Sequence, residues 1–506
     1  MADPATTLPG LMFVGAVFLL TIFLSLNYKS WWISIFIFIF LFILCLVTDT
    51  GLSRIDYNFI FPPAWRLLHG YGLNQTFSIY EHFLSILTAV WIKFFPIGTL
   101  PLLGRFSYFA LFFGTYFFAR NLFNNKQLAC YLLISLVIVK IYGNLLPPDA
   151  IMQVTPWRLD WWIVLLALAY WKTTHHWIIG ASLGLLIIFH HSFGCIYTIS
   201  YFIFILMLIF FKRSFSLYFR NLIIVVIAFL LYGIFLHPQL DMALFYQKTG
   251  MGFLRITRQS FYWYMPVIFA TTFLLICKNR SLLSQRFFET SILLLSLAIG
   301  NSMYFFGRSH ENNIINIAGV LLTVFFLFLD LIDVELKQLT SKKFSRGAVP
   351  LMACAVILAI SYQYADRAIK LVHTQFSNLK DHRFISDSFS DFESLDFSKL
   401  RTLTNSSPKV IFVSQQDFYF YYFGGYALPQ DYRCYTCSWF IMKNYINYLN
   451  DQLKKGFYIV INPQEMSAQR DIINALNARY FSNTSDLLVI SNNPMRNFDK
   501  TLWYRS

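Results

Sequence analysis

Charged residues are scarce in this sequence. They make up 13% of its 506 residues, whereas soluble globular domains carry about 25%. Hydrophobic residues account for 57% and aromatic residues for 19%. Apolar runs long enough to cross a bilayer recur from residue 11 to about residue 365. The composition excludes an ordinary soluble domain and predicts a polytopic α-helical membrane protein.

Other features are missing altogether. No basic stripe alternates with exposed aromatic residues, so the net charge of +15 does not indicate nucleic-acid binding. The opening segment MADPATTLPG has no basic region and no small-residue cleavage pattern, so we expect the first apolar run to be a retained helix. No internal repeat of the kind that builds many transporters is recognisable.

The seven cysteines carry little chemical signal. Five lie in or beside apolar runs and are interpreted as core residues. Cys434 and Cys437 stand apart in a polar segment, CYTC, with no thioredoxin-like unit around them. A structural disulfide or two free thiols is therefore favoured over a catalytic redox pair.

The apolar runs predict about twelve membrane-spanning helices. They cover residues 11–26, 31–48, 105–122, 127–143, 157–171, 176–190, 193–211, 221–237, 261–277, 288–306, 313–332 and 348–365. Every second loop between them is rich in Lys and Arg, which places those loops in the cytoplasm and both termini outside. Residues 80–96 are also apolar, but a further crossing would break this alternation. We expect them to form a surface or re-entrant helix.

Polar residues appear throughout the chain after about residue 366. Apolar runs there shorten to strand length at 409–414, 457–462 and 486–491, with helix-like stretches at 438–456 and 464–481. The predicted organisation is a transmembrane domain over 1–365, with a long outer loop at 49–104, followed by a small extracytoplasmic α/β domain over 366–506.

The loops assigned to the outer face hold an unusual set of charged and histidine side chains. Cations on this face go against the usual charge bias, so we expect them to have anionic partners. The set comprises Asp49, Asp56, Arg158, Asp160, His190, His191, Arg255, Arg258, Arg308, His310 and Glu311.

Asp49 and Asp56 follow the second predicted span closely, and Tyr57 comes next. A carboxylate facing an enclosed site beside the bilayer can accept a proton from an acceptor group or hold a divalent metal such as Mg²⁺ or Mn²⁺. The alternative is that both aspartates only cap the helix end in water.

The segment DTGLSRIDYNFIFPPAWRLLHGYG resembles the first outer loop of the GT-C superfamily of integral-membrane glycosyltransferases. In that family an Asp, often followed by an aromatic residue, precedes a short surface helix with an Ala…Leu-Leu-x-Gly run. The matching residues are Asp56, Tyr57, Ala64, Leu67, Leu68 and Gly70. The following span, GRFSYFALFFGTYFFARNLF, and the terminal α/β domain fit the same plan. Two departures are YEHF in place of a Pro-Pro pair and two spans before the loop.

This resemblance implies a specific activity. GT-C enzymes transfer a sugar from a polyprenyl-phosphate or polyprenyl-diphosphate donor to a glycan, lipid or protein acceptor outside the cytoplasm. It implies an enzyme of the inner (plasma) membrane, in which Asp56, or secondarily Asp49, engages the acceptor. Tyr57 contributes to substrate binding, and basic residues hold the donor phosphate.

Residues 304–322 carry the densest polar cluster. Arg308 and His310 suit a lipid phosphate, while Asn312 and Asn313 suit sugar hydroxyls. Asn316 lies one turn further along the predicted helix. In the alternative reading, Arg308 pairs with Glu311 in a solvated turn.

Three other residue pairs on the predicted outer face could serve either a structural or a functional role. Arg158 and Asp160 form either a local ion pair or part of the site. Arg255 and Arg258 suit a substrate phosphate or lipid headgroups equally well. His190 and His191 are adjacent and do not share a helix face, so a metal site from this pair alone is not expected. We assign His191 to the substrate site.

Other functions remain open at this stage. A transporter or flippase for a lipid-linked sugar would need broken helices near the midplane. A polymerase or ligase of lipid-linked saccharides would have a dominant late outer loop, whereas the longest loop here, 49–104, comes early. A catalytically inactive relative that serves as a binding scaffold is the remaining alternative.

Overall fold

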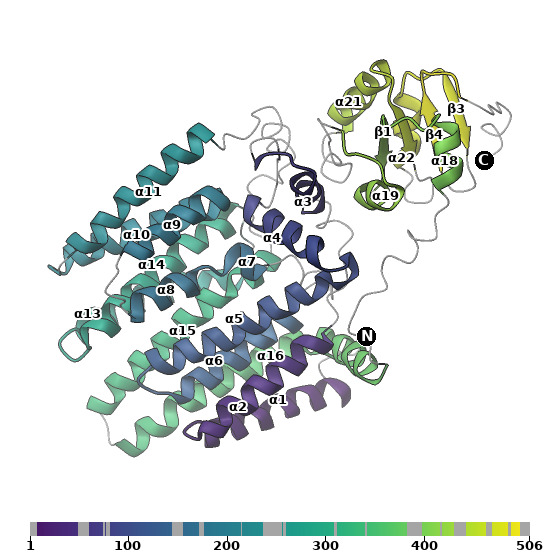
Figure 1. Ribbon diagram of the computed structural model, residues 1–506. Coiled ribbons are helices and arrows are strands. Elements are labelled where there is room, and N and C mark those ends of the chain that lie inside the picture. The colour runs from purple at the N-terminus through teal and green to yellow at the C-terminus, as the bar shows by residue number, and fades with distance from the viewer. Residues whose placement is uncertain are drawn as a thin grey trace. The chain divides into compact units, whose positions relative to one another are not determined.

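The computed structural model describes the following residues: 8–48, 60–73, 76, 81–143, 155–171, 177–213, 215–235, 256, 260–307, 311–339, 342–381, 397–414, 417–429, 442–461, 468–483 and 487–495. The chain divides into two compact units, drawn in Figure 1. Unit 1 comprises Met1–Gly51, Thr99–Leu236 and Met251–Ser386, and unit 2 comprises Leu52–Gly98, His237–Gly250 and Asp387–Ser506.

All the regular elements of unit 1 within its described residues are helices. Its helices are α1 (Leu8–Asn27), α2 (Trp31–Val47), α5 (Leu100–Leu122), α6 (Gln127–Val137), α7 (Thr155–Leu159), α8 (Trp162–Trp171), α9 (Trp177–Phe189), α10 (His191–Phe210), α11 (Ser216–Phe235), α13 (Tyr264–Lys278), α14 (Gln285–Gly307), α15 (Glu311–Leu339) and α16 (Lys342–Lys380). A π-helical turn, η5 (Ile138–Tyr142), continues α6. Each predicted span therefore falls on helix, except that the span 157–171 is divided between α7 and α8.

Seven helices among the described residues are long and apolar enough to cross a membrane. Shorter apolar helices, such as α2, α9 and α13, accompany them. By helix length and hydropathy the chain is a multi-pass membrane protein, as its composition predicts. The last long helix, α16, continues to Lys380 and so passes through residue 365, where the sequence placed the domain boundary.

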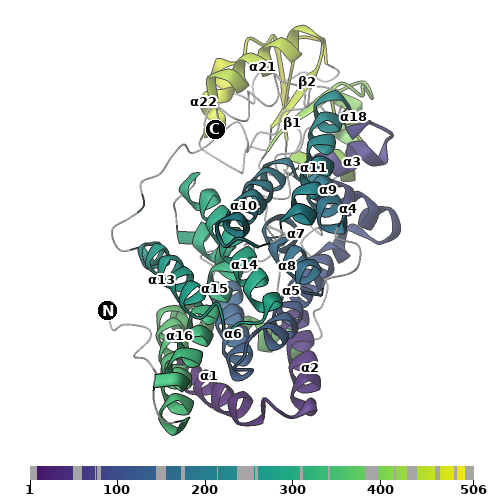
Figure 2. The same ribbon diagram turned by 90° about the vertical axis from the view of Figure 1, so that its left-hand side faces the viewer.

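Helix α15 occupies the interior of unit 1. It packs against α6, α13, α14 and α16, and Figure 2 shows it among these neighbours. The most apolar stretch of α15 is 83% buried inside the protein, whereas that of the peripheral helix α1 is only 17% buried. Polar side chains on α15 are thus held inside the helical bundle and need partners there.

Unit 2 combines two helices from the region predicted as the long outer loop with the C-terminal α/β fold. The loop helices are α3 (Phe61–Leu68) and α4 (Glu81–Phe94), which pack against each other. The predicted helix at 80–96 is therefore confirmed as a helix, while its position relative to the membrane stays a prediction. The C-terminal helices are α18 (Phe397–Leu403), α19 (Asp417–Gly424), α21 (Met442–Lys454) and α22 (Ala468–Ala475).

A four-stranded sheet forms the centre of the C-terminal fold within the described residues. It contains β1 (Val410–Val413), β2 (Tyr458–Ile461), β3 (Tyr480–Asn483) and β4 (Leu488–Ser491), in the order β1-β2-β4-β3. β1 and β2 are parallel, and β4 runs antiparallel to both of its neighbours. The three predicted strands are confirmed. The predicted helix at 464–481 was too long, because its last residues form β3, which pairs with β4.

Alternate residues of β1 face opposite sides of the sheet, as strand geometry requires. Ile411 and Val413 join the apolar core formed with α21 and α22. Phe412 instead stacks on Phe420 of α19 at 5.4 Å, and its backbone N–H donates to the Tyr421 hydroxyl at 3.1 Å. Burial raises the pKa of Tyr421, and the bond from Phe412 to its hydroxyl helps to hold α19 on the sheet.

Candidate functional site

A buried polar cluster forms in unit 1 where α6, the α7–α8 junction, α14 and α15 meet. Its members are a lysine, an aspartate, an arginine, a tyrosine and two asparagines. We call it the Lys140–Asp160 cluster, and it comprises Lys140, Arg158, Asp160, Tyr304, Asn313 and Asn316.

Lys140 lies in the π-helical turn η5. The Gly143 N–H donates to the Ile138 carbonyl at 2.9 Å and closes this wider turn. Single π turns inside α-helices frequently occur at functional sites. The Lys140 side chain is 1% exposed, and its Nζ lies 3.2 Å from Asp160 Oδ2 and also donates to the Asn316 carbonyl. The π turn thus brings a cation to α15 and to the α7–α8 junction.

Asp160 lies where the predicted span 157–171 is interrupted. The structure has two helices, α7 and α8, because the chain turns at Asp160 and Trp161. The Trp162 indole N–H donates to Asp160 Oδ1 at 2.9 Å, and the Tyr197 hydroxyl donates to the Leu159 carbonyl at 2.5 Å. These bonds satisfy polar groups that the interruption exposes.

Helix α15 approaches the ion pair very closely. A Cβ atom on Gly319 would lie 2.9 Å from Asp160 Oδ1, closer than real Cβ atoms come. A side chain at this point of α15 would push against the Asp160 carboxylate, and glycine avoids that contact. Its absent side chain lets the helix backbone reach the Lys140–Asp160 pair.

The other half of the cluster is made of neutral groups and an arginine. Asn313 Oδ1 accepts from the Tyr304 hydroxyl and from Asn316 Nδ2, each at 3.3 Å. The Arg158 guanidinium lies over the Tyr304 ring, 5.7 Å from its centroid. Three residues selected from the sequence, Arg158, Asp160 and Asn313, are thus brought into one cluster.

The same π turn supports the end of α2, directly before Asp49. The Tyr142 hydroxyl donates to Gln375 Oε1 at 3.2 Å, and Gln375 Nε2 donates to the Thr48 hydroxyl at 2.7 Å. Arg105 of α5 donates to the Leu46 carbonyl at 3.0 Å. The chain that leads into the acidic segment therefore starts from a fixed point, one that η5 connects to the Lys140–Asp160 cluster.

His191 begins α10 and has other neighbours. Its ring stacks on Tyr232 of α11 at 4.3 Å, and its Nε2 lies 3.8 Å from Cys195 Sγ. The adjacent His190 contacts Phe193, which in turn contacts Tyr304 of the cluster. The described contacts thus connect His190, rather than His191, to the cluster. The substrate role of His191 stays a prediction.

Several predicted site residues lie outside the described part of the chain. Glu311 and Asn312 belong to α15, but the structure does not describe their side chains. The residues outside are Asp49, Asp56, Tyr57, Arg255, Arg258, Arg308, His310, Cys434 and Cys437. Within the described ranges, no group of three or more His, Cys, Asp or Glu residues is arranged to hold a metal ion. The possible metal at Asp49 and Asp56 is therefore not tested.

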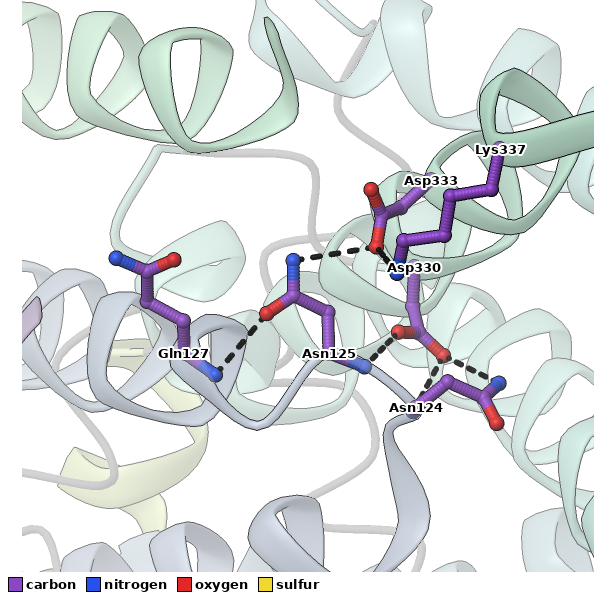
Figure 3. Close-up of polar contacts among 6 residues, drawn as sticks. All are labelled: Asn124, Asn125, Gln127, Asp330, Asp333 and Lys337. Carbon is purple, nitrogen blue, oxygen red and sulfur yellow. Dashed lines mark hydrogen bonds and ion pairs between the residues drawn. The ribbon is translucent and has the colours of Figure 1, made fainter. Parts of the chain in front are cut away.

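A second polar cluster lies near the other end of α15. Asp330 accepts the backbone N–H groups of Asn124 and Asn125 at 2.9 and 2.7 Å, and Asn124 Nδ2 at 3.1 Å (Figure 3). Asp333 accepts from Asn125 Nδ2 and pairs with Lys337. These bonds join the α5–α6 loop to α15, so the cluster acts as a structural clamp.

The two clusters are separated by most of a membrane thickness. At a rise of about 1.5 Å per residue, Asp333 lies roughly 30 Å along α15 from Asn313. The hydrocarbon core of a bilayer is about 30 Å thick. The Lys140–Asp160 cluster therefore lies at the end of the bundle that the charge pattern assigns to the outside.

Sequence reasoning missed Lys140 and Tyr304. The signal for Lys140 was present, because a lone lysine in the run YLLISLVIVKIYG is costly in a membrane unless it is paired. Tyr304 gave no comparable signal, since tyrosines near span ends are common.

Comparison with known proteins finds no family model that matches the chain and no curated protein with significant similarity to it. The likeness to the GT-C superfamily therefore rests on the loop residues quoted above, and the functional argument rests on the site.

Proposed function

We propose that the protein is a GT-C-type membrane glycosyltransferase, which transfers a sugar from a polyprenyl-phosphate or polyprenyl-diphosphate donor to an acceptor on the extracytoplasmic face. In this proposal about twelve helices cross the inner membrane, with both termini outside. The observation that carries it is the shared π turn. Lys140 and Tyr142 connect a buried polar cluster at the outer end of the bundle to the chain that leads into the acidic loop.

In the proposed reaction, the acidic loop activates the acceptor, and the basic residues with the Lys140–Asp160 cluster bind the donor. An acceptor oxygen attacks the anomeric carbon of the sugar, and the bond from that carbon to the donor phosphate breaks, so the polyprenyl phosphate or diphosphate leaves with the electron pair. Asp56, with Asp49 as second candidate, takes the acceptor proton. Arg308 and His310 neutralise the phosphate, while Arg158 and Asn313 orient the donor from the Lys140–Asp160 cluster.

The decisive experiment measures sugar transfer by the purified protein in lipid nanodiscs, with a labelled polyprenyl-phosphate sugar as donor. Asp56→Asn keeps the side-chain shape and removes the charge, so we expect a folded protein whose turnover falls about 10²–10⁴-fold. Asp49→Asn is the matched variant, and a loss confined to it would transfer the role to Asp49. Full activity in both variants would exclude the mechanism.

One observation favours a second candidate function. The interruption between α7 and α8 and the π turn place broken helix geometry beside a buried charged pair, as in many transporters. The same fold could then move a lipid-linked saccharide across the membrane. Sealed proteoliposomes distinguish the two functions: a transporter changes the leaflet of the labelled lipid without breaking the sugar–phosphate bond.

A further inference from the structure

In unit 2, the loop helix α3 packs directly on α19 of the C-terminal fold. The Phe61 ring lies parallel to the Phe418 ring at 5.1 Å, with 6° between their planes, and meets the Tyr419 ring edge-on at 5.8 Å. Trp65 adds an edge contact to Tyr422 at 5.0 Å. Phe61 and Phe418 are both fully buried. The contact is therefore a core between two segments far apart in the sequence.

An arginine adds a polar bond to this aromatic contact. Arg66 is only 7% exposed, and its Nη2 donates to the carbonyl of Pro429, in the chain that follows α19. The Arg66 guanidinium also lies 5.9 Å from the Tyr71 ring centroid. A buried guanidinium is costly unless it is hydrogen-bonded, so this bond selects one position of α3 on the C-terminal fold.

Helix α3 depends on this packing for its own structure. It has eight residues, and isolated helices shorter than about 12–15 residues are marginal in water. Pro62 and Pro63 fix its first turn, but most of its stability must come from α19 and α4. Loss of the α19 contact should therefore destabilise α3, which would keep only its packing on α4.

Helix α3 directly follows the segment that contains the candidate aspartates, so its contact with α19 bears on the proposed function. Residues 49–59, which include both candidate aspartates, join Thr48 of unit 1 to Ile60 and Phe61 of unit 2. One end of this segment is fixed by Gln375 at Thr48. The other end is fixed by the contact of Phe61 with α19.

We infer that the C-terminal domain anchors the acidic loop through α3, with Phe61, Arg66 and Phe418 as positioning residues for acceptor activation. The inference rests on the proposed function for its catalytic consequence, but the anchoring of α3 can be measured without it. Because these residues act on the loop, their loss should lower turnover and change acceptor kinetics. The donor groups belong to unit 1, so the apparent KM for the donor should stay the same.

Hydrogen–deuterium exchange on the full-length protein in nanodiscs tests the anchoring. In Phe418→Ala we expect the amides of α3 to lose about tenfold or more of their protection, because truncation of a buried aromatic ring is strongly destabilising. Arg66→Met keeps the apolar stem and removes the guanidinium, with its bond to Pro429 and its contact with Tyr71, so it should act in the same direction without threatening the domain fold.

Phe420→Ala is the matched control. Phe420 is a buried phenylalanine of the same helix, but it stacks on Phe412 of β1 and not on α3. We expect this variant to lose protection in β1, with α3 affected less than in Phe418→Ala. Equal losses in α3 for the two variants would mean general unfolding of the domain and would overturn the specific anchoring role.

Sugar transfer by the same variants tests the positioning. A ten- to hundredfold fall in turnover for Phe418→Ala and Arg66→Met, with donor KM unchanged, supports it, since small misplacements of a reacting group cost about that much. Unchanged α3 protection in both variants overturns the anchoring, and a released α3 with normal turnover overturns the positioning role. A wild-type chain without transfer activity would instead overturn the proposed function, while the exchange data still decide the anchoring.

Discussion

Lys140 is the only charged side chain in the run from Gln127 to Tyr142, and it is almost completely buried. An isolated ammonium group there would carry a large desolvation cost. Its partner Asp160 is equally buried and receives a second bond from Trp162. Each charge therefore needs the other, and we expect their contributions to stability to be strongly coupled.

Removal of one partner should be far more damaging than removal of both. In Lys140→Met the Asp160 carboxylate stays buried without its cation, a change that typically costs about 3–5 kcal/mol. The double variant Lys140→Met with Asp160→Asn keeps an acceptor for Trp162 and removes both charges, so it should recover much of that loss. Thermal unfolding of the purified variants in detergent measures the coupling.

Lys278→Met provides the control for this cycle. Lys278 also pairs with a carboxylate, that of Glu335, but its side chain is 63% exposed. We expect almost no change in its unfolding temperature. Single-variant losses at Lys140 and Asp160 that simply add in the double variant would show that the pair is not coupled.

At the scale of elements, α15 organises unit 1 through polar contacts at both ends. Its first turns receive Lys140 and Tyr304, and its last turns hold the α5–α6 loop through Asp330. Between them the helix is apolar and buried against α6, α13, α14 and α16. The position of Asn313 and Asn316 therefore depends in part on the clamp at the opposite end of the same helix.

Asp330→Asn should loosen the α5–α6 loop. The carboxylate accepts three hydrogen bonds from Asn124 and Asn125, whereas an amide keeps a single acceptor oxygen and leaves at least one of these N–H groups without its partner. Such a loss typically costs about 1–3 kcal/mol. We expect a lower unfolding temperature and faster amide exchange at residues 123–127.

The matched substitution is Asp366→Asn on α16. Asp366 pairs with Lys370 at 3.1 Å, but its side chain is 47% exposed, so the same chemical change should have little effect. An Asp330 variant as stable as this control would contradict the clamp.

For the whole molecule, the main prediction concerns topology. The charge pattern places Lys212 and Lys342 inside the cell, whereas Ser309 and the residues after 366 should be outside. In a cysteine-free background, we expect a cysteine introduced at Ser309 to react with a membrane-impermeant maleimide in intact cells. Cysteines at Lys212 or Lys342 should react only after permeabilisation.

Labelling of the Ser309 position only after permeabilisation would place the Lys140–Asp160 cluster at the cytoplasmic end. The acceptor and donor assignments to the outer face would then be lost together. A mixed pattern between Lys212 and Lys342 would instead show that fewer than twelve helices cross the membrane.

Local sequence patterns determined most of the secondary structure of this protein. The predicted span segments fall on helices, apart from the break between α7 and α8, because hydropathy and run length act over about twenty neighbouring residues. The strands β1, β2 and β4 follow from short apolar runs in a polar context. β3 was missed, since the segment before Tyr480 continues a helical pattern and the strand depends on pairing with β4.

The sequence also selected Arg158, Asp160 and Asn313 because polar residues near spans are expensive. Only the tertiary structure decided their partners. The Lys140–Asp160 pair requires a π turn and an interrupted helix, and no local sequence pattern predicts either of them. The bonds from Gln375 to Thr48 and from Arg66 to Pro429 join residues 327 and 363 positions apart. Such contacts arise from packing between distant segments, whereas the local pattern reports only which residues need burial or a partner.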